Sequence, residues 1–314
     1  MRLSFLALLA VALGSLASCD TYENDPYRDL VVVDAIMEAL APVPSVFLST
    51  TVPLEATSNP SENGLDGAAV TLERLAPDGT VADTIQYFSA FSSGQYVPNP
   101  FELPIPTVRP ATRYRLRIDA PGYDPIWAET VVPDTFSTVV PPNSPLVYQG
   151  PEQPTVVVTP SAFPGRQTVY IFSVLAQSQS ANNPNPDDLV PLFRSIYDTI
   201  EGESDRREFL KDVLFGSSPL LNEEGYSVNP GGTLTVPVPW AAFGYYGFNK
   251  LSASAVDDAL LLFLSTQAAQ FTPTTLSPGE IPNITTNVQG GLGVFGAYAR
   301  SESFIVIERD VGEP

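Results

Sequence analysis

Acid–base or metal chemistry in this chain would have to depend on carboxylates. The 314-residue sequence contains no histidine and a single cysteine, Cys19, so histidine-dependent triads and zinc or copper sites lose their usual nitrogen and sulfur groups. One acidic cluster follows a polar, proline-broken stretch and consists of Asp187, Asp188, Glu201, Glu203 and Asp205. Such carboxylates could bind Ca²⁺ or supply a glycosidase pair, but loop acids in an acidic chain are usually only solvated. We therefore expect no catalytic residue, no metal and no cofactor.

Cys19 lies directly after an apolar N-terminal segment. A basic start and an apolar run over residues 3–13 lead into Leu16-Ala17-Ser18-Cys19, a pattern typical of signal peptides and too short for a membrane span of about 20 residues. It resembles a bacterial lipoprotein signal, which is cleaved before an acylated cysteine. We predict a signal peptide over residues 1–18 and lipid attachment at Cys19, which would hold the protein on the membrane through acyl chains. An ordinary secretory signal that leaves a free cysteine is the alternative.

The composition limits both partners and fold. A formal net charge of −20 would repel nucleic acid and anionic lipid headgroups. Prolines account for 32 of the 314 residues, about twice the usual share, which excludes long helices from most of the chain. The composition therefore favours an acidic, mainly β protein that does not bind nucleic acid.

Short β-branched and aromatic runs alternate with turn formers through the first half. Tyr114, Leu116 and Ile118 alternate with arginines, and this period of two predicts half-buried antiparallel strands. Strands are expected at residues 30–33, 46–48, 69–72, 81–88, 114–118 and 128–132. The pattern predicts an immunoglobulin- or transthyretin-like β-sandwich domain over residues 30–133, after an acylated flexible tether at residues 19–29.

The second half predicts another β-rich unit. A proline-rich linker is expected over residues 134–154, followed by a C-terminal β-rich domain over residues 155–314. Its strands are expected at residues 155–158, 168–175, 233–238, 247–252 and 304–307. Helices are expected near residues 205–215 and 255–270, with capping boxes from Asp205 to Glu208 and from Ser254 to Asp257. The predicted fold is thus two tandem β-sandwich-like domains, the second with two short-to-medium helices.

Glycines gather near the end of the chain. Residues 291–296 formally match Gly-x-Gly-x-x-Gly, but a strand follows where a dinucleotide fingerprint needs a helix. We expect these glycines to let the backbone turn tightly or approach a neighbouring strand. We also expect an apolar helical stripe to pack near them and near the terminal strand; it consists of Val256, Leu260, Phe263 and Leu264.

Two further motifs have both functional and structural interpretations. An aromatic-rich stretch could stack on sugars or anchor a partner, or could simply pack in the core; it contains Trp240, Phe243, Tyr245, Tyr246 and Phe248. Thr84 and Thr199 lie in Asp-Thr-Ile triplets that match a short bacterial O-glycosylation pattern. Three-residue matches are common, so modification remains open at both.

Longer motifs indicate a family. Residues 254–260 and Asn287 to Tyr298, together with the N-terminal cysteine motif, resemble the domain of unknown function 4249 family of Bacteroidota lipoproteins over essentially the whole chain after the leader. The most specific part is an asparagine, two residues and then Gly-Gly-x-Gly-x-Phe-Gly; Val288-Gln289 departs mildly from the family pattern. Members commonly lie beside genes for TonB-dependent receptors, which implies a partner role. The family implies no functional residue, because its activity is unknown.

These observations predict a lipid-anchored protein of the outer membrane, on the cell surface or the periplasmic face. We expect a non-enzymatic accessory protein that binds a ligand, of unknown identity, together with a TonB-dependent outer-membrane receptor. A structural or adhesive envelope module is the alternative, and a carboxylate-based hydrolase is a third. Membrane association would depend on Cys19 alone.

Overall fold

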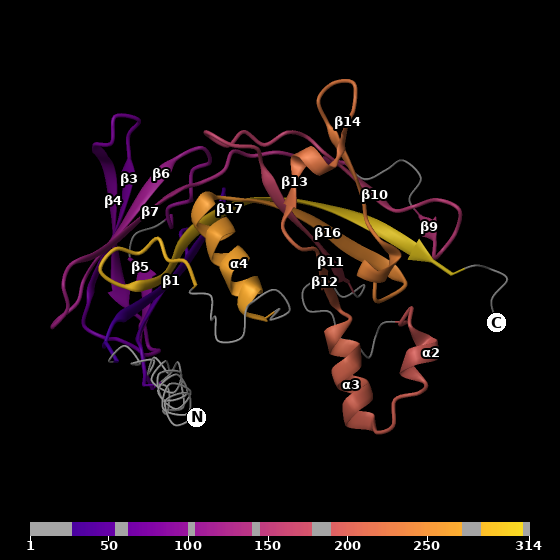
Figure 1. Cartoon of the computed structure of the whole chain (residues 1–314), viewed down its shortest axis with the longest axis horizontal. Helices are drawn as coiled ribbons and strands as arrows, with labels where there is room; N and C mark the ends of the chain where they lie inside the picture. Colours follow the sequence, from indigo (N-terminus) through magenta and orange to yellow (C-terminus); the bar gives the residue numbers. More distant parts are fainter. Residues whose placement is uncertain are drawn as a thin grey trace, which may run out of the picture.

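A computed structural model describes residues 27–53, 62–99, 104–139, 145–177, 190–271 and 284–309. Within these ranges the protein is mainly β, as the sequence predicts, with a large 13-stranded sheet and a second sheet of four strands. Figure 1 shows two lobes, one built from the first half of the chain and one from the second, with a single long strand running through both.

The first lobe is a strongly curled stretch of the large sheet. Its strands follow the order β1-β2-β5-β4-β3-β6-β7, with the bounds β1 (Val31–Glu38), β2 (Val46–Thr50), β3 (Ala69–Leu75), β4 (Val81–Ser89), β5 (Gln95–Pro98), β6 (Arg113–Asp119) and β7 (Ile126–Val131). The curl brings β7 back to the segment before the last strand, where Trp127 and Gln289 form an isolated backbone bridge. The strands therefore enclose one core.

Side-chain alternation explains which face of each strand is buried. On β6, Tyr114, Leu116 and Ile118 are buried while the arginines between them point outward. The same period of two places Val31, Val33, Ala35 and Met37 of β1 in the core. The predicted half-buried strands are confirmed, and β5 is a strand of this lobe that the sequence analysis did not separate.

The second lobe has two layers. One layer is the end of the large sheet, and the other is the four-stranded sheet in the order β14-β15-β10-β8. The strands are β8 (Thr138–Val139), β9 (Leu146–Val147), β10 (Thr155–Val158), β11 (Val169–Ala176), β12 (Phe215–Ser217), β13 (Leu221–Asn222), β14 (Ser227–Val228), β15 (Leu234–Pro237) and β16 (Gly247–Val256). Two single-turn 3₁₀ helices lie among them, η3 (Glu223–Gly225) and η4 (Trp240–Ala242). The inner faces of the two layers form a second core.

The segment predicted as a linker contains paired strands. β8 pairs with β10, and β9 pairs in parallel with the end of the last strand. Tyr148, just after β9, packs edge-on against Trp240 with ring centroids 5.4 Å apart. The described parts of residues 134–154 are therefore held against the second lobe.

The described helices are α2 (Arg194–Tyr197), α3 (Glu203–Asp212) and α4 (Asp258–Phe271). The predicted capping box at Asp205 is wrong, because α3 begins after Gly202 and has no side-chain cap. α3 also ends before residue 215, since Phe215 already pairs with β11. The box from Ser254 is wrong as well, because β16 continues through Val256 and Asp257 itself accepts a hydrogen bond from Leu260 N.

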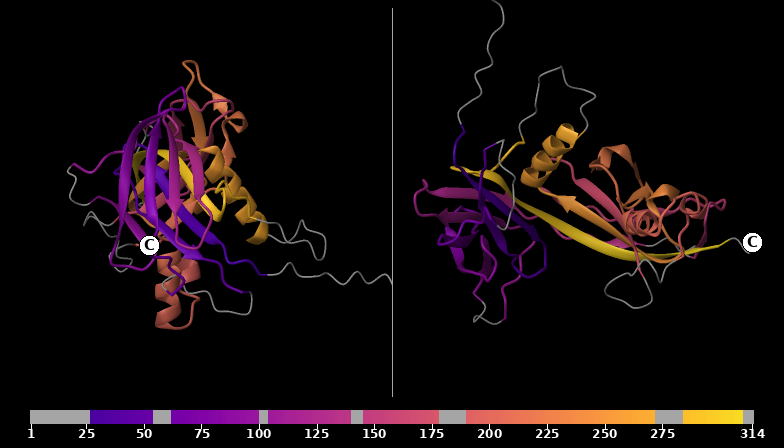
Figure 2. Two further views of the ribbon diagram at one scale, coloured as in Figure 1. Left: turned by 90° about the vertical axis from the view of Figure 1, so that its left-hand side faces the viewer. Right: turned by 90° about the horizontal axis from the view of Figure 1, so that it is seen from below.

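The last strand, β17 (Leu292–Glu308), joins the two lobes. Its first part pairs in parallel with β1, and its later part pairs antiparallel with β16. At about 3.3 Å per residue, its 17 residues extend about 56 Å, as its length across both lobes in Figure 2 illustrates. Phe295 lies in the first core and Ile305 in the second, so one strand contributes to both.

α4 packs beside β17, as predicted. Val256, Leu260 and Leu264 cluster with Tyr298 of β17. Phe263 is half-buried and lies outside this cluster, whereas Leu261 belongs to it. The predicted stripe is therefore confirmed except at Phe263. Among the described residues, no helix has the length and apolar character needed to cross a membrane.

Candidate ligand-binding cleft

A cleft of about 430 Å³ opens between the two layers of the second lobe. The inner face of the large sheet supplies one wall and the four-stranded sheet supplies the other. The apolar side chains on these walls are Val156, Phe172, Val174, Val236, Val238 and Leu251. Proline and alanine residues complete the lining, among them Pro219, Pro237, Pro239 and Ala242, and these three prolines are exposed. Ligand sites typically have about this size and an apolar lining.

A bulge in the edge strand lies beside the cleft. Ser218 still pairs with Phe172, both through its backbone N–H and through its hydroxyl, which accepts from Phe172 N at 2.9 Å. Pairing resumes at Leu221 opposite Tyr170, so Pro219 and Leu220 together oppose a single residue of β11. Proline cannot donate to the ladder, and an extra residue bends the strand away from its neighbour. Pro219, which lines the cleft, therefore lies where the sequence interrupts the edge strand.

Tyr226 supplies a polar group within the apolar lining. Its side chain lines the cleft, and its hydroxyl has no hydrogen-bond partner among the described residues. Burial raises the pKa of this phenol above 10.0, so the hydroxyl stays neutral and can donate at physiological pH. Four serines also line the cleft, Ser173, Ser217, Ser218 and Ser252, so the phenol is one of several polar groups that could orient a ligand.

The glycine motif is structural. A Cβ on Gly291 would lie 2.7 Å from the carbonyl oxygen of Val31, and one on Gly293 would overlap the carbonyl oxygen of Val33. Gly293 also has a φ of +101°. Of the two roles predicted for these glycines, close approach to a neighbouring strand is confirmed, and that strand is β1.

Asn287 holds the same segment in place. Its side-chain amide donates to the carbonyls of Glu129 and Phe295 at 3.0 and 2.8 Å, and its carbonyl oxygen accepts from Phe295 N at 3.0 Å. These bonds attach the start of β17 to β7. The asparagine and the glycines of the family motif therefore position a strand.

Among the described residues, the most deeply buried acid joins the two lobes. Asp257, which is 1% exposed, accepts a hydrogen bond from the Thr130 hydroxyl of β7 and another from Leu260 N at the start of α4. Burial raises the pKa of this carboxyl above 3.8, although its hydrogen bonds oppose the shift. The sequence analysis treated Asp257 only as a capping-box partner, because nothing in the sequence pairs it with Thr130.

The predicted acidic cluster is only partly visible. Asp187 and Asp188 lie outside the described residues, whereas Glu201, Glu203 and Asp205 are exposed at the start of α3. The described part of the chain contains no group of three or more acidic or cysteine side chains that could hold a metal ion. Cys19 also lies outside the described residues, so its lipid attachment stays a prediction.

Most of the aromatic stretch packs in the second core. Phe243 and Tyr245 are fully buried, Trp240 and Tyr246 are half-buried, and Phe248 is exposed. For the buried members, the core-packing alternative is confirmed. Thr84 and Thr199 are both exposed, and their modification stays a prediction.

Comparisons with known proteins identify a family whose function is unknown. The family model described as Domain of unknown function (DUF4249) matches residues 19–303. No curated protein matches the chain.

Several solved structures also match, and two of them are of much longer proteins. Trypsin-activated alpha-2-macroglobulin from Escherichia coli matches with 10% identity and a TM-score of 0.20, over 74% of this chain and 15% of that one. Escherichia coli alpha-2-macroglobulin activated by porcine elastase matches with 9% identity and a TM-score of 0.24, over 90% of this chain and 20% of that one. TM-scores this low establish no shared fold.

Proposed function

The chain belongs to the family of domain of unknown function 4249, and on this premise we propose that it is a non-enzymatic, lipid-anchored binding protein of the outer membrane. In this proposal the cleft of the second lobe takes an apolar small molecule, and the protein works as an accessory partner of a TonB-dependent receptor. The absence of histidine from the sequence favours binding over the commonest forms of acid–base catalysis.

The cleft is the observation that supports ligand binding. Its volume of about 430 Å³ falls within the range of about 300–1,000 Å³ typical of small-molecule sites. Its walls bring together Phe172, Val236 and Leu251 from three strands, while Tyr226 and four serines supply hydroxyl groups. A largely apolar ligand with a hydrogen-bond acceptor for Tyr226 matches this lining.

Filling the cleft should abolish binding of an apolar probe. Val156 points into the cleft, so phenylalanine at this position would occupy space that a ligand needs. We expect Val156→Phe to weaken binding of the fluorescent probe N-phenyl-1-naphthylamine by about tenfold or more. Tyr226→Phe, which keeps the ring and removes the hydroxyl, should leave binding of this probe nearly unchanged.

The matched control is Val157→Phe. Val157 is the next residue on β10 and does not line the cleft. Phenylalanine at this position therefore adds the same bulk on the opposite face of the strand. Circular dichroism would verify that each variant is folded. If the wild-type protein leaves the probe unbound, or if both valine variants bind it as tightly as the wild type does, the cleft is not a ligand site.

The membrane part of the proposal depends on Cys19. Expressed in a bacterium with its leader intact, the wild-type protein should incorporate labelled fatty acid, sediment with membranes and recover an outer-membrane receptor after detergent solubilisation. Cys19→Ala should lose the label and leave the membrane pellet, because acyl chains supply the anchor. A labelled, membrane-bound wild type that recovers no receptor would favour the structural or adhesive module instead.

A further inference from the structure

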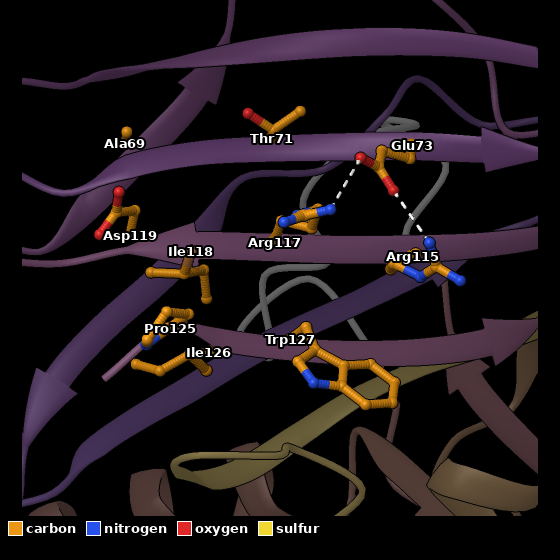
Figure 3. A pocket seen from close by; sticks show the side chains of 10 residues that line it. All are labelled: Ala69, Thr71, Glu73, Arg115, Arg117, Ile118, Asp119, Pro125, Ile126 and Trp127. Carbon is orange, nitrogen blue, oxygen red and sulfur yellow. Dashed lines mark hydrogen bonds and ion pairs between the residues drawn. The ribbon is translucent and has the colours of Figure 1, made fainter. Parts of the chain in front are cut away.

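We propose that the outer face of β3, β6 and β7 is a second binding site, which takes neutral hexopyranose units of a glycan through Trp127 and a row of polar side chains beside it. Figure 3 shows the residues that line a hollow of about 530 Å³ here, most of them on this outer face. The site lies on the first lobe and is separate from the cleft proposed above.

Strand register brings the polar row together. Trp127 of β7 is the direct cross-strand partner of Arg117 on β6. Arg117 is in turn opposite Thr71 on β3, and Thr71 is opposite Gln86 on β4. Neighbouring strands lie about 4.8 Å apart, so this row extends about 14 Å. That length suits an oligosaccharide rather than a single small ion.

Trp127 gives the face its apolar platform. The side chain is 45% exposed, because Ile126 and Ala128 on either side of it point into the core. An exposed indole ring on a sheet face offers a flat apolar surface, and a pyranose ring has a complementary face of C–H groups. The position of Trp127 beside polar groups suits a ligand that is apolar on its face and polar at its edge.

Ion pairs fix the polar groups before a ligand arrives. Glu73 has a side chain only 12% exposed and lies between two arginines, 3.4 Å from Arg115 and 3.7 Å from Arg117. Arg115 also binds Glu129, with 2.6 Å between guanidinium and carboxylate. Groups held in place by such contacts lose little freedom on binding. Arg117 remains 61% exposed, so its guanidinium is accessible to a ligand.

The charge balance favours a neutral sugar over an acidic one. The outward charged residues on these three strands are Arg113, Arg115, Arg117, Glu73, Asp119 and Glu129, so three cations offset three carboxylates. Arginine only donates hydrogen bonds and a carboxylate only accepts them, and a sugar hydroxyl can do both. A net charge of −20 on the whole chain would repel a uronic-acid polymer.

Tryptophan fluorescence can test this site directly. The chain contains two tryptophans, so Trp240→Phe leaves Trp127 as the sole reporter. We expect cellohexaose, maltohexaose or α-1,6-linked mannohexaose to shift the emission of Trp127 and to bind by isothermal titration calorimetry. Trp127→Ala should weaken binding by about tenfold or more, and Arg117→Gln should weaken it less. Trp127→Tyr, which keeps an aromatic ring, should bind more tightly than Trp127→Ala but less tightly than the wild type.

Two outcomes would overturn the proposal. One is that none of the three neutral hexamers binds at millimolar concentration. The other is that hexagalacturonate binds more tightly than all of them, which would make the face an anion site. Val156→Phe, which fills the separate cleft, should leave sugar binding unchanged, so this test and that of the proposed function can fail independently.

Discussion

Replacing Gly293 with alanine should destabilise the protein by about 2–6 kcal/mol, because backbone strain costs about 1–3 kcal/mol and overpacking costs a similar amount. Gly293 has a φ of +101°, and a Cβ there would overlap the carbonyl oxygen of Val33 on β1. The overlap involves main-chain atoms, so side-chain rotation cannot relieve it. The parallel pairing of β1 with β17 would have to open, and that pairing joins the two lobes.

Gly122→Ala separates the two causes. Gly122 has a φ of +88°, and a Cβ there would meet nothing within 4 Å, so only the backbone conformation is penalised, by about 1–2 kcal/mol. Urea unfolding followed by circular dichroism should give a clearly larger loss for Gly293→Ala than for Gly122→Ala. Equal losses would mean that contact with β1 is unimportant at Gly293.

The sequence analysis located strands better than it located their partners. Tyr114, Leu116 and Ile118 define one buried face by alternation alone, and this local signal was sufficient to predict β6. β17 was predicted only at Phe304 to Ile307, because the glycines before it suggest a turn. Which strand they approach is a non-local property, and β1 is more than 250 residues away along the chain.

The candidate sites show the same limit. The sequence analysis considered Trp240, either as a binding aromatic or as a core residue, and did not consider Trp127; the structure half-buries Trp240 and exposes Trp127. Alternation along β7 would have indicated this, because Ile126 and Ala128 point to the core on either side of Trp127. The cleft had no comparable signal, since its walls come from two sheets whose packing no short motif specifies.

Removing the carboxyl of Asp257 is the other substitution with a large expected effect. Asp257→Ala removes the cap of α4, at a cost of about 0.5–2 kcal/mol, and leaves the Thr130 hydroxyl without its acceptor, at a cost of about 1–3 kcal/mol. The neighbouring Asp258, whose side chain is 64% exposed in an ion pair with Arg166, provides the control. Asp258→Ala should cost about 0–1 kcal/mol in urea unfolding, and equal losses for the two variants would refute a joining role for Asp257.

The pH dependence of stability tests the burial of this acid separately. Because burial raises the pKa of Asp257 above 3.8, the folded chain holds this proton more tightly than the unfolded chain does. The contribution of Asp257 to stability is therefore greatest below 3.8 and falls as pH rises through the folded pKa. Asp257→Asn keeps an acceptor for Leu260 N and cannot titrate. The stability of this variant relative to the wild type should therefore increase as the pH rises from 3.8 to the pKa of Asp257 in the folded protein. Urea midpoints measured at a series of pH values would show this; a constant difference between the two proteins would mean that Asp257 has the same pKa in the folded and unfolded chain.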